Sequence, residues 1–112
     1  ICVGHLGEAL PFLLDRIDNR LKFVKTPQVI MEKSMKYYFK NNVFVTTSGN
    51  MSKEAFQCAK DVLGMDHILY GSDYPYEPFS DMLSFLASVP MTEEEREKLY
   101  YKNATEKLGI AF

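Results

Sequence analysis

Three side chains in this sequence could carry acid–base or metal chemistry if the fold brings them together. His5 and Glu8 are separated by only two residues, and Asp73 lies in the second half of the chain. An imidazole titrates near neutral pH, so it can move protons in catalysis or bind a metal ion. A carboxylate can orient that imidazole or bind a divalent cation. We therefore treat His5, Glu8 and Asp73 as the parts of one candidate site.

Each candidate also has an ordinary structural explanation. A single histidine at the end of a strand is often only a hydrogen-bonded polar group. Glu8 could complement the dipole at the start of a helix, and Asp73 could cap the helix that follows it. Residue types alone leave these alternatives open, so the surrounding elements have to decide between them.

The candidates follow short apolar segments that we predict to be buried β-strands. These segments lack polar alternation, as expected for parallel strands covered on both faces; they are Ile1–Gly4, Val43–Thr47 and His67–Tyr70. Ligands bind at the carboxyl ends of parallel strands, and strands one apart lie about 10 Å from each other. His5 and Asp73 could therefore reach one small ligand or metal ion. His67 lies at the opposite end of its strand and is predicted on the surface.

Helical patterns separate and follow the strands. We predict helices from Glu8 to about Arg20, over Pro27–Lys40, from the N-cap Ser52 to Leu63, over Phe79–Ala87, and from the capping box Thr92–Glu95 to Leu108. Gly64 and Gly109 are expected to stop the helices before them. Strands that alternate with helices imply βαβ units, so the predicted fold class is α/β with parallel strands.

Composition argues against several classes of function. The 112 residues carry a net charge of −2 without a basic stripe, so a nucleic-acid partner is not expected. No apolar run is long enough for a membrane span, so no membrane partner is expected either. Cys2 and Cys58 are predicted to be reduced thiols of a cytoplasmic protein, although a single disulfide stays open. No nucleotide-binding glycine motif is present, and no nucleophile-elbow pattern surrounds Ser48.

The beginning of the chain is unusual for a natural start. Residue 1 is Ile rather than Met, and a strand-like run begins at once, although frayed termini gain nothing from apolar side chains. A processed N-terminus is one explanation. We favour another, in which residues 1–112 are a C-terminal fragment of a single barrel domain, because three parallel strands alone would leave exposed apolar edges.

Five sequence blocks carry a family resemblance that covers nearly the whole chain. They are Gly4–Phe12, Arg16–Asp18, Thr46–Asn50, Ile68–Pro75 and Asn103–Ala104. In this order and spacing they resemble the C-terminal part of the amidohydrolase-related (amidohydrolase 2) decarboxylases. This group includes γ-resorcylate, 2,3-dihydroxybenzoate and aminocarboxymuconate semialdehyde decarboxylases. The first and fourth blocks together are specific for the family, whereas either block alone is a weak signal.

The resemblance implies a fold and a role for each candidate. The family has a distorted (β/α)₈ TIM barrel with one divalent metal ion, zinc or manganese, and the predicted strands would be its strands six to eight. His5 matches the family's general acid/base, Glu8 the carboxylate that works with it, and Asp73 a metal-binding aspartate. The family's first-strand metal motif and its metal-binding histidine after strand five have no counterpart in this sequence. We therefore expect an active parent enzyme and an isolated chain that is inactive and binds metal weakly or not at all.

The expected function is that of a metal-dependent decarboxylase, a carbon–carbon lyase, acting on a small aromatic or unsaturated carboxylic acid. A metal-dependent hydrolase of the same superfamily would use the same groups. The alternative from another class is a non-catalytic α/β binding module. By position alone, Asn50, Tyr74 and Tyr76 are predicted to bind substrate. The resemblance also leads us to expect a homo-oligomer.

Overall fold

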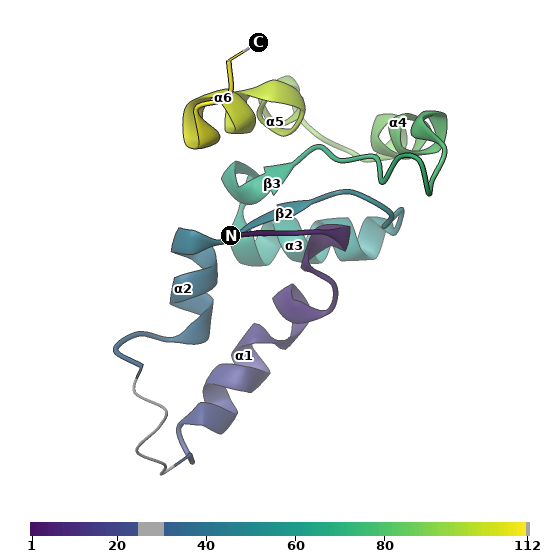
Figure 1. Ribbon diagram of the computed structural model, residues 1–112. Helices are drawn as coiled ribbons and strands as arrows, with labels where there is room; N and C mark the ends of the chain where they lie inside the picture. The colour runs from purple at the N-terminus through teal and green to yellow at the C-terminus, as the bar shows by residue number, and fades with distance from the viewer. Residues whose placement is uncertain (25–30, 112) are drawn as a thin grey trace.

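Three short parallel strands form the centre of the fold. The computed structural model describes residues 1–24 and 31–111. The strands β1 (Cys2–Val3), β2 (Phe44–Thr46) and β3 (Ile68–Leu69) lie side by side in that order, and both pairings are parallel (Figure 1). The α/β class and the three parallel strands are therefore confirmed, although each strand is shorter than the apolar segment that predicts it.

Helices fill the connections between the strands and follow the last one. The predicted bounds of the first, third and fourth helices are right to within two residues at each end. In the structure the helices that match predictions most closely are α1 (Leu10–Leu21), α3 (Lys53–Leu63) and α4 (Phe79–Ser88). None of the helices in the described part of the chain is long and apolar enough to span a membrane.

The second helix differs from its prediction. It is α2 (Met35–Asn42), whereas the sequence pattern favours a start near Pro27; residues 25–30 lie outside the described residues, and 31–34 are not helical. The physical reason is a capping arrangement that comes partly from another helix. The Asp18 carboxylate of α1 accepts hydrogen bonds from the backbone N–H groups of Met35 at 2.6 Å and Lys36 at 3.1 Å. The Ser34 side chain accepts a third from Tyr37, which fixes the helix start at residue 35.

At the other helix ends, the predicted capping residues are the ones observed. Ser52 caps α3 by accepting from the Ala55 N–H at 3.1 Å. Thr92 and Glu95 form both bonds of the capping box that opens α5 (Glu93–Glu97). Gly64 and Gly109 end their helices with φ of 88° and 68°.

The predicted final helix is not uniform. Between α5 and α6 (Asn103–Leu108) lies a π-helical turn, η3 (Lys98–Lys102). This region docks on β3: the buried Asn103 amide donates to the carbonyl oxygens of Met65 at 2.7 Å and Ile68 at 2.8 Å. The Leu99 carbonyl also accepts from the Tyr70 N–H at 3.1 Å. These bonds fix the end of β3 and therefore the loop that follows it.

The other end of the strands is closed by the turn η2 (Met65–His67). The sequence places His67 at the start of the third strand, but the structure places it at the end of this turn. Its Nδ1 lies 2.8 Å from the Val43 carbonyl oxygen, and its ring stacks on Phe44. The prediction of a surface residue is right only in part, because His67 is half-buried and holds β2 and η2 together.

The core lies between the strands and the helices around them. The helix α1 packs against α2 and α3, while η3 and α6 pack against β3, as the arrangement in Figure 1 shows. Fully buried apolar side chains come from every layer: Leu6, Leu14, Val45, Phe56, Ile68, Met82, Leu86 and Leu99. Both cysteines are free, as predicted. Burial of this cluster fixes the strands whose carboxyl ends carry the candidate residues.

Candidate functional site

The candidate site begins in a left-handed turn directly after β1. This turn is η1 (His5–Gly7), and four successive residues from His5 to Glu8 have φ between 52° and 78°. Non-glycine residues adopt such φ values at a cost of about 1–3 kcal/mol each, and they persist only where the surroundings enforce them. Leu6 supplies part of that enforcement, because its side chain is buried in the core. The turn thus presents His5 and Glu8 on one side while Leu6 anchors it on the other.

His5 and Glu8 contact each other through their side chains. Nδ1 of His5 lies 2.8 Å from Oε1 of Glu8. A carboxylate only accepts hydrogen bonds, so the contact places a proton on Nδ1 and leaves Nε2 facing away from Glu8. Glu8 does not serve the helix dipole in the first turn of α1, because that helix begins at Leu10 after an Ala9 N-cap. The structure therefore favours an orienting role toward His5 over the helix-dipole alternative.

Asp73 approaches His5 from the loop that follows β3. Its Oδ2 lies 3.7 Å from Nε2 of His5, and its backbone has φ of 66°. Its carbonyl oxygen accepts from the N–H groups of Tyr76 and Glu77, which closes the loop. Asp73 does not cap α4, because the N-cap of that helix is Pro78, without a side-chain hydrogen bond. Its carboxylate is instead directed at the imidazole.

The loop between β2 and α3 packs against both candidates. The Ser48 hydroxyl accepts from the His5 N–H at 3.4 Å, and the Asn50 amide donates to the His5 carbonyl at 3.3 Å. Thr47 is fully buried, and its hydroxyl donates to the Gly71 carbonyl at 2.7 Å and accepts from the Gly71 N–H at 3.1 Å. Sequence reasoning missed these supporting contacts. The available signal was the run of small polar residues after the middle strand, next to both candidate loops.

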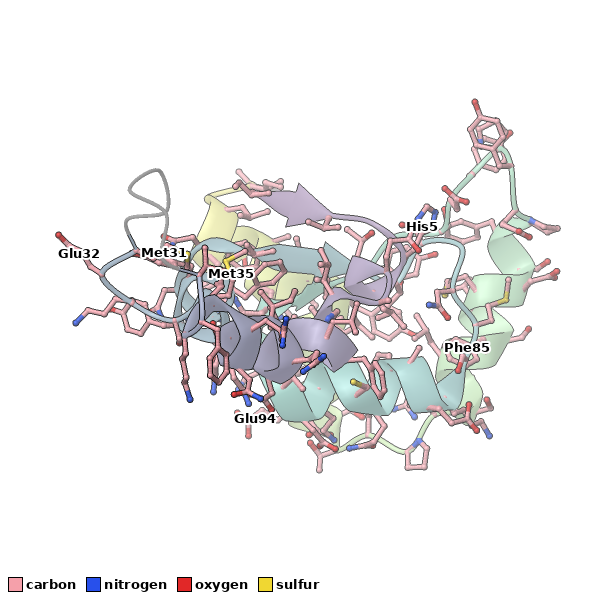
Figure 2. All side chains as sticks on the ribbon, turned by 90° about the horizontal axis from the view of Figure 1, so that it is seen from below. His5, Met31, Glu32, Met35, Phe85 and Glu94 are labelled. Carbon is pink, nitrogen blue, oxygen red and sulfur yellow. The ribbon has the colours of Figure 1, made fainter. Side chains whose placement is uncertain are left out.

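The three residues predicted to bind substrate lie in different surroundings. Asn50 directs its amide to backbone groups, donating to His5 and accepting from the Ser52 N–H at 3.2 Å. Tyr74 and Tyr76 are 75% and 88% exposed in the loop before α4. Their substrate-binding role stays a prediction. Figure 2 shows His5 at the end of the strands, on the side of the molecule where the loop leads to α4.

The candidate residues fit part of a metal site. Ligand atoms about 2.1 Å from one ion stand roughly 3–4 Å from each other, and the 3.7 Å between His5 Nε2 and Asp73 Oδ2 falls in that range. The glycine at residue 49 allows both side chains to take these positions, because a β-carbon there would lie 3.1 Å from Nε2 and 2.8 Å from Oδ2. Within residues 1–24 and 31–111, no three His, Cys, Asp or Glu side chains converge as a metal site. These residues can thus supply two ligands at most.

Comparison with known proteins places the chain in a family. Residues 1–110 match the sequence model of the family described as amidohydrolase. The chain belongs to the amidohydrolase family. A γ-resorcylate decarboxylase from Polaromonas sp. (strain JS666) is 33% identical to this amidohydrolase chain over 105 residues, which are 93% of the chain and 32% of that protein. The family resemblance inferred from the sequence blocks is therefore confirmed.

Two solved structures resemble the amidohydrolase chain closely. A 2,6-dihydroxybenzoate decarboxylase in complex with 2,6-dihydroxybenzoate is 32% identical, with a TM-score of 0.88 over 98% of this chain and 34% of its own. A dihydroxybenzoic acid decarboxylase from Polaromonas sp. JS666, with bound manganese and the inhibitor 2-nitroresorcinol, is 33% identical, with a TM-score of 0.86 over 99% of this chain and 34% of its own. The chain thus spans about a third of the length of the decarboxylases that it matches.

Proposed function

We propose that this amidohydrolase chain is the part of a metal-dependent decarboxylase that contributes strands six to eight of its (β/α)₈ barrel. The proposed substrate is a small aromatic carboxylic acid, the class to which 2,6-dihydroxybenzoate belongs in the related structure. The observation that carries the proposal is the convergence of His5, Glu8 and Asp73 after β1 and β3, with contacts of 2.8 and 3.7 Å. Catalytic groups lie at this end of the strands in barrel enzymes.

His5 would act as the general acid. Loss of CO₂ from an aromatic acid requires a proton on the ring carbon that bears the carboxylate; the carbon–carbon bond then breaks, and its electron pair restores the ring. An imidazolium can deliver that proton from Nε2 at neutral pH. Glu8 lies 2.8 Å from Nδ1, so it orients the ring and directs Nε2 away from itself. The His5 side chain is 44% exposed, which allows it to be reprotonated from solvent.

Asp73 would hold a divalent metal ion together with ligands from the rest of the protein. The ion would be manganese, which is bound in the related Polaromonas structure, and no observation favours zinc. When bound, the ion would supply positive charge that helps to bind and polarise the substrate carboxylate. No specific observation favours the hydrolase or the non-catalytic module as a second function. The homo-oligomer and the cytoplasmic location stay predictions.

The test is a His5→Asn substitution in the full-length protein, assayed with 2,6-dihydroxybenzoate. We expect kcat to fall by about 10²–10⁴-fold, the usual contribution of general acid–base catalysis, while bound manganese is retained. His67→Asn is the matched control, because the chain's other histidine lies at the opposite end of the strands. Unchanged turnover in His5→Asn would contradict the proposal. Equal loss of manganese and turnover would make His5 a metal ligand instead of the acid.

A further inference from the structure

A glycine lies where the loops that follow β1, β2 and β3 meet. Gly49, between β2 and α3, has φ of 64°. A β-carbon at this position would lie 2.8 Å from Oδ2 of Asp73, 2.8 Å from Cδ2 of His5 and 3.1 Å from its Nε2. Contacts of 2.8 Å are shorter than real β-carbons tolerate, so any other residue would push the imidazole or the carboxylate away. The side chains of His5 and Asp73 can therefore take these positions only because residue 49 has no side chain.

The neighbouring Asn50 ties the same loop to the backbone of His5. Its Nδ2 donates to the His5 carbonyl at 3.3 Å, and its Oδ1 accepts from the Ser52 N–H at 3.2 Å. The first bond holds a residue whose φ is 52°, and the second fixes the start of α3. Asn50 thus links a strained turn to a helix that packs in the core, which is what a strained backbone requires in order to persist.

We propose that Gly49 and Asn50 are positioning residues of the site: Gly49 allows the side chains of His5 and Asp73 to lie next to each other, and Asn50 holds the turn that presents His5. The inference rests on the proposed function and deepens it. Neither residue touches the reacting atoms in this scheme. The positioning role proposed for Asn50 differs from the sequence prediction, in which its amide binds substrate directly. Kinetics distinguish substrate binding from positioning, because loss of a substrate contact raises KM, whereas displacement of the acid lowers kcat.

The first experiment compares Gly49→Ala with Gly109→Ala in the full-length protein. Gly109 has φ of 68° and no atom within 4 Å of an added β-carbon, so both variants place alanine at a similar positive φ, but only Gly49→Ala adds an atom beside His5 and Asp73. We expect Gly49→Ala to lower kcat on 2,6-dihydroxybenzoate by about 100-fold and to weaken Mn²⁺ binding by about 10–100-fold. Gly109→Ala should change neither by more than about twofold. Equal kcat and Mn²⁺ affinity in the two variants would overturn the role of Gly49.

The second experiment compares Asn50→Asp with Asn41→Asp. In Asn50→Asp the side chain keeps the oxygen that accepts from the Ser52 N–H, but it loses the N–H group that donates to the His5 carbonyl. Asn41 is the control because its amide also donates to a backbone carbonyl, that of Tyr37, within α2. We expect kcat of Asn50→Asp to fall by about tenfold with KM changed less than about twofold, and Asn41→Asp to match the parent. A raised KM with an unchanged kcat would overturn the positioning role. This comparison tests the role of Asn50 independently of whether Gly49→Ala folds.

The two proposals fail in different ways. If His5→Asn lowers kcat while Gly49→Ala matches Gly109→Ala, the decarboxylase proposal stands and the role of Gly49 is wrong. If His5→Asn leaves turnover unchanged, the proposed acid is wrong. The Mn²⁺ affinity of Gly49→Ala is measured separately from turnover, by titration of metal-free protein. That affinity therefore tests whether Gly49 shapes the space beside Asp73 whatever the result for His5.

Discussion

At the scale of single residues, the candidate site is held in unfavourable backbone conformations. His5, Leu6, Glu8 and Asp73 are non-glycine residues with φ between 52° and 66°. Such residues gather at functional sites because a strained backbone can aim a side chain where regular structure cannot. Three of the four carry the chemistry proposed above, and the fourth, Leu6, is buried and anchors the turn. Burial of Leu6 therefore helps to hold the backbone conformation that presents His5 and Glu8.

Asp73→Asn should weaken metal binding in the full-length protein. Asparagine keeps the size of the side chain and removes the charge that attracts a divalent cation, so we expect the Mn²⁺ affinity to fall by about 100-fold or more. The measurement is equilibrium dialysis against MnCl₂. Asp81→Asn is the control, because Asp81 is exposed in the first turn of α4, where its hydrogen bond comes from Ser80. Equal affinity in the two variants would remove Asp73 from the metal site.

The sequence indicates part of this site and not all of it. His5, Glu8 and Asp73 are predictable because chemically active side chains follow apolar strands, and parallel strands end at one edge of a sheet. The roles proposed for Gly49 and Asn50 depend on how closely two loops approach each other, which no local pattern encodes. Glycine and asparagine are also common in ordinary turns, so their presence alone does not indicate a site.

At the scale of elements, capping residues predict the end of a helix well when their partners are close in the sequence, but not when a cap comes from a distant segment. Ser52, Gly64, Thr92 and Gly109 are capping residues whose partners lie within a few positions along the chain, and all four behave as expected. The start of α2 was predicted wrongly, because Asp18, a residue of another helix, supplies two of its caps. A cap that comes from a distant segment leaves no periodic pattern in the sequence.

The capping box of α5 should make the stability of the protein depend on acid pH. A hydrogen bond from Lys60, whose Nζ lies 2.7 Å from Oε1, lowers the pKa of Glu95, and the Thr92 N–H lowers it further. A lowered folded-state pKa means that the stabilisation is present above the unfolded value of about 4.3 and is lost as pH falls through the folded pKa. Lowering the pH from about 6 to 3 should therefore weaken the wild type more than Glu95→Gln.

Urea unfolding of the full-length protein at several pH values checks this expectation. At pH near 7, Glu95→Gln should lower the free energy of unfolding by about 1 kcal/mol, a value that allows for solvent screening of a partly exposed pair. Glu93→Gln is the matched control, because it removes a carboxylate from the same helical turn and leaves the ion pair between Lys60 and Glu95 in place. Stability curves of Glu95→Gln and the wild type that run parallel down to acid pH would contradict the assignment.

At the scale of the whole molecule, the fold leaves surfaces that ordinary parallel sheets cover. In the described part of the chain, β1 and β3 each have one strand neighbour, β2. Large apolar side chains such as Ile1 and Phe12 are 85% and 79% exposed. Parallel sheets normally have helices on both faces and paired strands at their edges. The parallel class was predictable from the apolar strands, but the substrate was not, because specificity comes from loops throughout a barrel.

These observations predict how residues 1–112 behave when they are expressed alone. In the proposed site Asp73 is the metal ligand, and among the described residues no three His, Cys, Asp or Glu side chains converge as a metal site, whereas catalytic zinc sites usually have three protein ligands. We therefore expect equilibrium dialysis at micromolar MnCl₂ to give about one Mn²⁺ per full-length protein and almost none per isolated chain. Sedimentation should show self-association of the isolated chain, driven by its strand edges and exposed apolar residues. A monomeric chain that binds one Mn²⁺ tightly by itself would show that the site is complete within these 112 residues, and the proposed sharing of ligands with the rest of a barrel would be wrong.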